Sequence, residues 1–334
     1  MKKIMVVGAS GVLGKLVCTE LLRIFNNQVK LTVTDYKADR GMKLAKSFDQ
    51  EVMFQYLDVT NEENTKKVLK NIDIVIVVLK QQNPYIQKAC VNNDILCIDV
   101  TPFTDFVEKI EILHQDTEKN EVGSIVMSGF FPGLSGLMVK KAVSNFHEIT
   151  EVNVGLLQNT NAQAGISGFS KKRKMYFFEP NNNREVRLID HAEKQFLQKA
   201  LHIKNINYWT SWNSVFFNKQ ISFLKKFGLI DVILTLNNNK FLSKIVKHNP
   251  NKNEDAFLTV EVTGIIDDTK CKKTLSLSTF SDYHLTAMVT AALAKIAVNK
   301  KIKGIVFPFE LTSVDEILSE MNCKSVTFKE FFQK

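Results

Sequence analysis

The chain of 334 residues lacks several features that would assign it to a class at once. No run of about 18 uncharged apolar residues is present, so the sequence predicts no membrane-spanning helix. The apolar run after Lys2 and Lys3 ends at Gly8, which is too short for the core of a signal peptide and is typical of a strand. The five cysteines are odd in number and widely spaced, with no Cys-x-x-Cys pair. They argue against a disulfide framework or a zinc site and favour reduced thiols in the cytoplasm.

The acid–base pair of one large class of oxidoreductases is also missing. Short-chain dehydrogenases use Tyr-x-x-x-Lys, in which the lysine lowers the pKa of the tyrosine. None of the six tyrosines of this chain has a lysine four residues later. The sequence therefore assigns no catalytic acid or base, and it offers no metal-ligand set.

A concentrated patch of charge of one sign is absent as well. The formal net charge is +9, but the basic residues are spread along the whole chain and only 171–174 form a run. No aromatic or glycine pattern accompanies this run, so it predicts a solvated face and not a nucleic-acid patch. Nucleic acid is not an expected partner.

The first 130 residues alternate short apolar segments with helical ones. Strands are expected at 3–7, 29–34, 53–57, 73–79, 96–100 and 124–127, and helices at 12–25, 39–48, 62–69, 85–92 and 106–118. Strands that are apolar on both faces and separated by helices predict a parallel sheet that is covered on both sides. The predicted fold class is α/β, with a doubly wound parallel sheet in residues 1–130.

After residue 146 this rhythm changes. Residues 151–158 predict a strand, and 257–266 and 272–280 alternate with period 2 around a turn at 267–270, as in an antiparallel hairpin. The alanine-rich segment 284–298 predicts a helix. We expect residues 131–300 to form a second, α+β domain with a mixed or antiparallel sheet.

Aromatic residues gather between positions 208 and 236, interleaved with lysines, and 214–236 is expected to be helical. Burial in a core is the favoured interpretation, because most aromatic stripes at helical spacing face a core. Two alternatives are the wall of an apolar substrate pocket and a peripheral contact with a lipid surface.

A glycine-rich segment follows the first expected strand and opens the first expected helix. Its spacing is G-x-x-G-x-x-G, in which Gly8 allows a tight turn, Gly11 lets a pyrophosphate approach and Gly14 lets the helix pack closely. The alternative is a purely structural turn. The residues predicted to bind a dinucleotide here are Gly8, Ala9, Ser10, Gly11, Val12, Leu13 and Gly14.

Three further residues at strand ends are candidates for cofactor binding. Asp35 lies 21 residues after Gly14, close to the spacing at which an acid accepts hydrogen bonds from the adenosine ribose. Its carboxylate would repel a 2′-phosphate and favours NAD, whereas Arg40 could serve a phosphate and leaves NADP open. Asp58 is a candidate for the adenine side, and Leu79 ends the fourth strand.

The segment SGFFPGLSG at 128–136 has more glycine than a turn needs. It follows the sixth strand, at the carboxyl edge of the sheet, where ligands of open α/β folds bind. Gly129 and Gly133 would allow a close approach to nicotinamide, Pro132 stiffens the turn, and Ser135 could cap the helix or donate to a substrate. The alternative is a tight crossover without a ligand.

Five segments, taken in this order along the chain, resemble saccharopine dehydrogenase-like oxidoreductases. They are GASGVLG at 8–14, IDVTPF at 98–103, SGFFPGLSG at 128–136, VEVTG at 260–264 and GIVFPFE at 304–310. The resemblance implies a Rossmann domain, an inserted substrate domain whose sheet forms a homodimer, and a segment 301–334 that returns to the Rossmann domain. It also implies hydride transfer between a nicotinamide cofactor and a small-molecule substrate.

The resemblance leaves the substrate open, because such proteins act on amino-acid conjugates, polyamine precursors and lipid-like enoyl compounds. A carboxylate-bearing substrate needs arginine forks, and the second domain has only Arg173, Arg184 and Arg187. Arg184 and Arg187 are the predicted substrate ligands, together with Ser135 and with Ser167 of the small-residue loop 165–168. The competing hypothesis is a dinucleotide-binding sensor without turnover, or a protein associated with a lipid surface.

Overall fold

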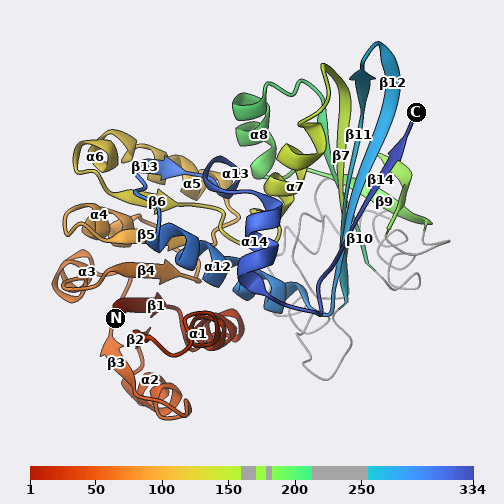
Figure 1. The fold of residues 1–334 in the computed structure, drawn as a ribbon. Helices are drawn as coiled ribbons and strands as arrows, with labels where there is room; N and C mark the ends of the chain where they lie inside the picture. Colours follow the sequence, from red (N-terminus) through yellow and green to blue (C-terminus); the bar gives the residue numbers. More distant parts are fainter. Residues whose placement is uncertain (159–170, 178–182, 213–254) are drawn as a thin grey trace, which may run out of the picture. The chain divides into compact units, whose positions relative to one another are not determined.

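The computed structural model describes residues 1–158, 171–177, 183–212 and 255–334. The chain forms two compact units, shown as ribbons in Figure 1. The first unit comprises residues 1–141 and 283–323, and the second comprises 142–282 and 324–334. The chain therefore passes from one unit to the other three times, and neither unit is a single stretch of sequence.

The first unit contains a seven-stranded parallel sheet in the order β13-β6-β5-β4-β1-β2-β3. Its strands are β1 (Lys2–Val7), β2 (Val29–Asp35), β3 (Val52–Tyr56), β4 (Ile74–Val77), β5 (Leu96–Asp99), β6 (Gly123–Ile125) and β13 (Gly304–Val306). Its helices are α1 (Val12–Ile24), α2 (Ala38–Ala45), α3 (Glu62–Val68), α4 (Tyr85–Val91), α5 (Thr104–Glu111), α6 (His114–Lys119), α7 (Leu134–Val143), α12 (Asp282–Val298), α13 (Pro308–Leu311) and α14 (Val314–Met321). The predicted doubly wound parallel fold is confirmed.

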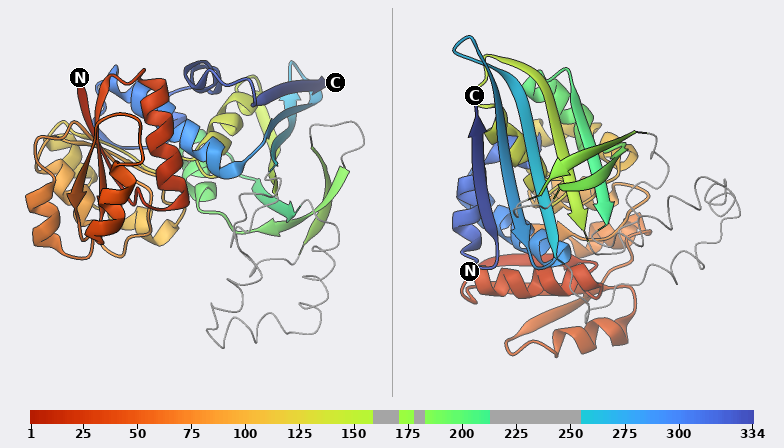
Figure 2. Two further views of the ribbon diagram at one scale, coloured as in Figure 1. Left: turned by 90° about the horizontal axis from the view of Figure 1, so that it is seen from below. Right: turned by 90° about the vertical axis from the view of Figure 1, so that its right-hand side faces the viewer.

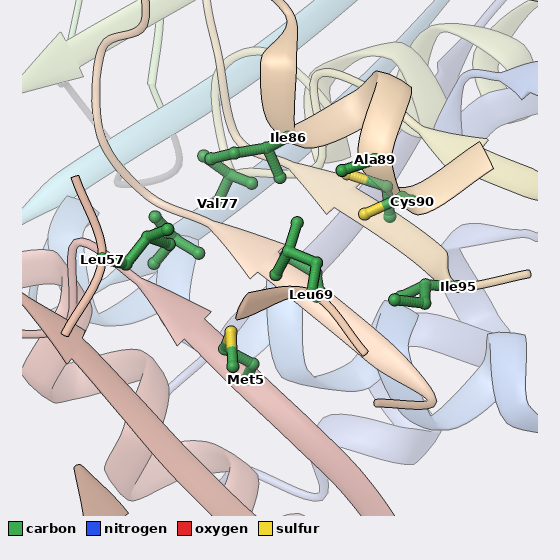
Figure 3. Close-up of a cluster of buried hydrophobic side chains, with 11 residues drawn as sticks. Met5, Leu57, Leu69, Val77, Ile86, Ala89, Cys90 and Ile95 are labelled. Carbon is green, nitrogen blue, oxygen red and sulfur yellow. The ribbon is translucent and has the colours of Figure 1, made fainter. Parts of the chain in front are cut away.

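The core of this unit explains why its strands carry so few polar residues. Figure 3 shows one cluster, in which Met5 of β1 and Val77 of β4 face Ile86 and Cys90 of α4, with Leu69 between them. Each of these side chains is at most 2 % exposed. Burying a side chain of this size stabilises the fold by about 1.5–3 kcal/mol, so the sheet is held by apolar contact with its helices.

Two features of the first unit differ from the prediction. The single helix expected at 106–118 is broken into α5 and α6, where the N–H of Leu113 donates to Ile110 and tightens the last turn of α5 (2.8 Å). His114, at the start of α6, then accepts a hydrogen bond from the backbone N–H of Ile305 in β13 (3.2 Å). The short strand β13 had no signal of its own in the sequence.

A buried carboxylate ties the returning part of the chain to the first helix. The Glu20 side chain of α1, only 5 % exposed, binds His284 of α12 (3.1 Å) and Arg23 (2.7 Å). Arg23 also donates to the carbonyl of Met321 at the end of α14 (2.9 Å). Burial raises the pKa of Glu20, but the hydrogen bonds from His284 and Arg23 outweigh it and hold the pKa below its usual value of 4.5.

We predict that Glu20→Gln destabilises the protein by about 1–3 kcal/mol at pH 7, because a charged acceptor is lost from two donors. The folded pKa of Glu20 is depressed, so its contribution is present above about pH 4.5 and is lost as the pH falls through the folded pKa. Urea unfolding of both proteins at pH 7 and pH 4 measures the difference. A difference in the free energy of unfolding between the two proteins that is as large at pH 4 as at pH 7 would contradict this role.

The second unit contains a seven-stranded mixed sheet in the order β14-β12-β11-β7-β10-β9-β8. Its described strands are β7 (Glu148–Gln158), β8 (Lys172–Tyr176), β9 (Asn183–Ile189), β10 (Ile206–Trp212), β11 (Ala256–Ile266), β12 (Thr269–Thr279) and β14 (Thr327–Gln333), and the helix within its described residues is α8 (Glu193–Leu201). Within the described strands only β7 and β10 pair in parallel. The expected α+β unit with a mixed sheet is confirmed.

Two features of this sheet depart from the prediction. The hairpin between β11 and β12 turns on Asp267 and Asp268 alone, both with positive φ, as in a two-residue type I′ turn. The strand β14 pairs with β12, so residues 324–334 belong to the second unit, whereas α13 and α14 stay with the first. A strand added there covers the outer edge of β12, which would otherwise expose unpaired backbone groups.

The hairpin of β8 and β9 crosses the longer strands obliquely, as Figure 2 shows in its right-hand view. We call the side of the sheet that carries a buried apolar cluster the inner face. The cluster consists of Leu157, Met175, Phe177, Val186 and Trp209. A Cβ on Gly155 of β7 would lie 2.8 Å from Cε of Met175, so a side chain there would have to displace Met175 where the hairpin crosses. The rings of Tyr176 and Phe331 meet edge to face and bring the end strands β8 and β14 together.

The aromatic segment is partly accounted for. Tyr208 and Trp209 lie on β10, a strand, and are 0 % and 7 % exposed, so burial is confirmed for these two. The helical stretch expected at 214–236 lies outside the described residues. No helix of the described residues is long and apolar enough to span a bilayer.

Candidate functional site

The loop between β1 and α1 turns tightly and packs closely on its helix. Gly8 has a φ of +87°, and the N–H of Gly11 donates to its carbonyl (3.1 Å). A Cβ on Gly14 would lie 2.3 Å from the same carbonyl oxygen, so only glycine allows this approach. A Cβ on Gly11 would meet only that oxygen, at 3.4 Å, among the described residues. Space beside Gly11 is therefore open.

The beginning of α1 is suited to an anion. Gly11 is the N-cap and offers no side chain to the first-turn N–H groups, and the first turn contains no acidic residue. These N–H groups and the helix dipole favour a negative ligand at this end. The open space and the free donors together fit the pyrophosphate of a dinucleotide.

We predict opposite effects for the two neighbouring glycines. Gly11→Val should keep the fold, because φ is −73° and the new side chain enters open space, but it should abolish dinucleotide binding. Gly14→Val should destabilise the protein by at least about 1–3 kcal/mol, because its Cβ overlaps the backbone of the loop. Thermal unfolding and calorimetric titration with NADH separate the two. A Gly11→Val protein that binds NADH normally would leave the loop as a structural turn.

The carboxylate of Asp35 is buried and already has a strong partner. Arg40 donates from Nε to Oδ2 (2.6 Å) and from its terminal nitrogen to Oδ1 (2.7 Å), and the N–H of Lys37 also donates (2.8 Å). Burial raises the pKa of Asp35, but the hydrogen bonds from Arg40 and Lys37 outweigh it and lower the pKa to about 2. Asp35 is thus ionised at the end of β2, and Arg40 neutralises it.

Asp58 and Leu79, two other predicted residues, have local structural contacts. The carboxylate of Asp58 accepts from both the N–H and the hydroxyl of Thr60, and these bonds lower its pKa. Leu79 lies against Gly8, where a Cβ would come within 3.0 Å of the Leu79 side chain. Leu79 therefore closes the loop where the sheet order reverses between β1 and β4.

One glycine of the Phe-Pro-Gly loop, Gly133, is needed by the loop itself. Gly133 has a φ of +121°, and a Cβ there would lie 2.3 Å from the carbonyl oxygen of Gly129. The N–H of Gly129 donates to the carbonyl of Pro132 (3.1 Å), and Leu134 donates back to Gly129 (2.9 Å). Ser135 is fully buried in the first turn of α7. The close approach inferred from the sequence is thus present within the chain's own backbone.

Asp99, at the end of β5, is a buried centre that the sequence did not identify as a site residue. Its Oδ2 accepts from Gln81 (2.9 Å) and Gln87 (2.7 Å), and its Oδ1 accepts from the N–H of Thr101 (2.8 Å). Its carbonyl accepts from both the N–H and the hydroxyl of Ser128. Asp99 therefore joins the segments that follow β4, β5 and β6. Only its place in the IDVTPF motif pointed to it.

The fully buried side chain of Asp99 is costly to ionise. Burial raises the pKa of this carboxyl to about 7, although the donors of Thr101, Gln81 and Gln87 act in the opposite direction. The carbonyl oxygens of Gln81 and Gln87 are buried and have no donor within the described part of the chain. The network thus has more hydrogen-bond acceptors than donors. Protonation of Asp99 removes a buried negative charge, which favours the neutral carboxyl.

We predict that the protein loses stability as the pH rises from about 4 to 7 because of Asp99. Its folded pKa is raised from 3.8 to about 7, so the full stability is present below pH 4 and the loss amounts to about 4 kcal/mol. Asp99→Asn should remove this slope. Urea unfolding between pH 5 and 8 compares the two proteins. Equal slopes would show that another group carries the dependence.

The two arginines predicted to bind substrate together do not face the same way. Arg184 pairs with Met175 in the register and lies on the inner face, whereas Arg187, three residues along β9, lies on the outer one. Arg187 approaches Glu185 (3.6 Å). Arg173, in the run expected to be a solvated face, instead binds the buried Glu261 (2.7 Å), because β8 turns this side chain inward. Ser167 and the loop 165–168 lie outside the described residues.

The second unit also holds a buried polar cluster that the sequence did not indicate. The hydroxyl of Tyr208 donates to Glu193 (2.9 Å), and the ring of His191 stacks on Tyr208 with centroids 4.2 Å apart. Burial lowers the pKa of His191 to about 3, so its ring is neutral at pH 7. Among the described residues no three His, Cys, Asp or Glu side chains converge as a metal site.

Comparisons with known proteins agree with this architecture. The family model for shikimate/quinate 5-dehydrogenase matches residues 1–104. Apo saccharopine dehydrogenase (L-Glu forming) from Saccharomyces cerevisiae is 14% identical, with a TM-score of 0.74 over 100% of both chains. No curated protein matches the sequence significantly.

Two further solved structures share the arrangement at lower similarity. An engineered D-amino acid dehydrogenase bound to NADP+ is 10% identical, with a TM-score of 0.51 over 93% of this chain and 94% of that one. DAP dehydrogenase from C. glutamicum, in complex with DAP, is 11% identical, with a TM-score of 0.51 over 95% and 98%. The resemblance indicated by the sequence motifs is thus confirmed in the structure, and the chain has the fold of saccharopine dehydrogenase over its full length.

Proposed function

We propose that the protein is a nicotinamide-dependent oxidoreductase of the saccharopine dehydrogenase-like type. The observation that carries this proposal is the loop Gly8–Gly14, whose open space beside Gly11 and uncapped helix start fit a pyrophosphate. The fold shared with dehydrogenases over the whole chain supports it. The five free cysteines suit a reducing compartment such as the cytoplasm.

In this proposal the first unit holds the cofactor, which supplies the hydride chemistry when bound. The residues from Gly8 to Gly14 bind the pyrophosphate, and Asp35 and Asp58 lie toward the adenosine end. Pro132 and Gly133 lie toward the nicotinamide end, in a loop that Ser128 fixes to the carbonyl of Asp99. The chain's contribution is to hold and orient the cofactor.

We propose NAD as the preferred cofactor, on the basis of the ionised Asp35. A carboxylate at the end of β2 accepts hydrogen bonds from ribose hydroxyls and repels a 2′-phosphate. Arg40 opposes this preference, since it is half exposed and within reach of a phosphate if it leaves Asp35. The choice between NAD and NADP therefore depends on the balance between these two side chains.

We predict that the two substitutions shift cofactor preference in opposite directions. Asp35→Asn should weaken NADH binding, because the amide is a weaker acceptor for the ribose hydroxyls. It should also reduce the ratio of NADH to NADPH affinity, because the negative charge that repels a 2′-phosphate is lost. Arg40→Gln should increase that ratio. Calorimetric titration of each protein with NADH and NADPH measures the ratio, with Arg23→Gln as a control arginine outside the site. Equal affinities of the unmodified protein for both cofactors would refute the assignment to NAD.

Turnover is tested by following NADH oxidation with imines formed from keto acids and amines. Oxidation with any member of such a panel, and its loss in Gly11→Val, would support the enzyme. Tight NADH binding without oxidation across the panel would favour a sensor. A homodimer formed through the second sheet, which the family resemblance implies, is tested by sedimentation.

A further inference from the structure

Two glutamine side chains meet the carboxyl group of Asp99 at a single oxygen atom. The Nε2 atoms of Gln81 and Gln87 both donate to Oδ2 of Asp99, at 2.9 and 2.7 Å. These bonds fix the orientation of both amides, because each nitrogen faces the carboxyl group and each oxygen points elsewhere. Gln81 is 7 % and Gln87 is 2 % exposed, so neither amide turns its oxygen into open solvent.

The two amide oxygens are left without hydrogen bonds by this arrangement. Oε1 of Gln81 and Oε1 of Gln87 are buried and have no donor within the described part of the chain. A buried acceptor without a donor is destabilising, and native structures contain few of them. The remaining donor of the network, the N–H of Thr101, also serves Asp99 (2.8 Å). All three donors thus face the carboxyl group, as an ionised carboxylate requires.

Protonation of Asp99 supplies a donor that the network lacks. A protonated carboxyl group has one O–H donor, whereas a carboxylate only accepts. If one glutamine turns its amide over, its Oε1 replaces its Nε2 beside Oδ2 and accepts from this O–H. The nitrogen and oxygen of an amide have nearly the same size, so the turn needs no repacking. It satisfies one of the two unpaired oxygens, and the other glutamine still donates to Oδ2.

The ionisable groups nearest to Asp99 on its own sheet stay neutral. The register places Val77 of β4 beside Asp99, and β6 contains only glycine, serine and isoleucine. Two residues before Asp99, the hydrogen bond with Cys90 of α4 and burial raise the pKa of Cys97 well above its usual value. These thiols therefore keep their protons while Asp99 changes its charge.

The lysines of the adjoining segments have other contacts. Nζ of Lys80 lies 4.4 Å from the centroid of the Phe103 ring, and Lys109 donates to the carbonyl of Gln82 (3.0 Å). The titratable side chains of α4 and α5 that are wholly or partly exposed are Tyr85, Lys88, Asp105, Glu108, Lys109 and Glu111. Burial raises the pKa of Asp99 to about 7, and the groups that oppose this rise are all neutral hydrogen-bond donors.

We infer that Asp99 is a proton-controlled positioning residue, which sets the orientation of the glutamine amides at the carboxyl edge of the first sheet. With Asp99 ionised, both amide nitrogens turn toward it and both amide oxygens turn away. With Asp99 protonated, one amide is turned over and its nitrogen takes the place of its oxygen. A group that approaches Gln81 and Gln87 therefore meets two acceptors in the first state, and one acceptor and one donor in the second.

This switch makes the binding of an N–H donor at this edge depend on pH, and for the cofactor that consequence rests on the proposed function. The carboxamide of nicotinamide has two N–H donors, which match two amide oxygens better than one oxygen and one nitrogen. NADH should therefore bind more tightly when Asp99 is ionised. ADP-ribose, which lacks the nicotinamide ring, should bind equally in both states.

The switch is tested in the free protein by NMR, with ¹³C-labelled aspartate and ¹⁵N-labelled glutamine. The amide signals of Gln81 and Gln87 are assigned by their loss in Gln81→Met and Gln87→Met. In the unmodified protein one of these amides should change its shift and its NOE contacts, with the same pH midpoint as the carboxyl carbon of Asp99. Asp99→Asn should abolish this change. Asp73→Asn is the matched control and should preserve it, because Asp73 accepts from the backbone N–H of Lys3 instead (2.7 Å).

Two results would overturn the switch. The first is that the NOE contacts of both amides stay constant while Asp99 titrates, because a change of charge alone moves shifts and not contacts. The second is that Asp99 keeps one protonation state between about pH 5 and pH 9. If Asp99→Asn does not fold, the unmodified protein decides, since separate midpoints for the amide and the carboxyl carbon contradict the switch.

Calorimetric titration at about pH 6 and pH 8 measures the coupling to the cofactor. NADH affinity should rise about threefold to tenfold, because the ionised fraction of a group with a pKa of about 7 rises from about one tenth to nine tenths. ADP-ribose affinity should stay constant, and neither ligand should show the rise with Asp99→Asn. Asp35 does not contribute, since its pKa is about 2.

The outcomes separate the switch from the proposed function. NADH affinity that is independent of pH, with amides that turn over in the NMR spectra, would overturn the coupling between Asp99 and the cofactor. Absence of binding of both NADH and ADP-ribose at either pH would refute the proposed function, while the NMR result still decides the switch.

Discussion

The carboxylate of Asp99 organises the carboxyl edge of the first sheet. The side-chain oxygens of Asp99 accept hydrogen bonds from Gln81 and Gln87, which follow β4, and from the backbone N–H of Thr101, which follows β5. The backbone carbonyl of Asp99 accepts a hydrogen bond from the hydroxyl of Ser128, which follows β6. The hydroxyl of Thr290 in α12 then donates to the carbonyl of Ser128, so the returning helix is fixed to the same point. Loops from three successive strands are therefore positioned by one residue. A ligand bound at this edge would contact loops that Asp99 already holds in place.

The two glycine loops at this edge use their glycines differently. In the first loop Gly14 is needed for helix packing, while Gly11 leaves space that the described chain does not fill. In the second loop Gly133 is needed because the carbonyl oxygens of Gly129 and Met127 approach it. A glycine-rich segment in a sequence thus has two explanations, self-packing and ligand approach, and contacts within the chain distinguish them. Here the explanation by ligand approach rests on Gly11.

The sequence predicted those parts of the fold that local pattern determines. The first six parallel strands and the β11–β12 hairpin follow from apolar runs and period-2 alternation, and they agree with the structure. Short strands such as β13, and β14 with its exposed aromatic residues, depend on pairing with distant edges, so their own residues carry little signal. The same limit applies to Asp99 and to the split between Arg184 and Arg187. Their roles come from contacts across the fold and from strand boundaries that the sequence did not define.

The threefold passage of the chain between the units determines the order in which the first sheet is completed during synthesis. Six of its strands leave the ribosome within the first 125 residues, but the seventh, β13, begins at Gly304, after most of the second unit. Until then β6 has an open edge, and α1 lacks the partners that His284 and Met321 provide. Exposed strand edges in nascent chains invite pairing with other chains. Translation through the second unit is thus an interval in which the growing chain needs protection from self-association.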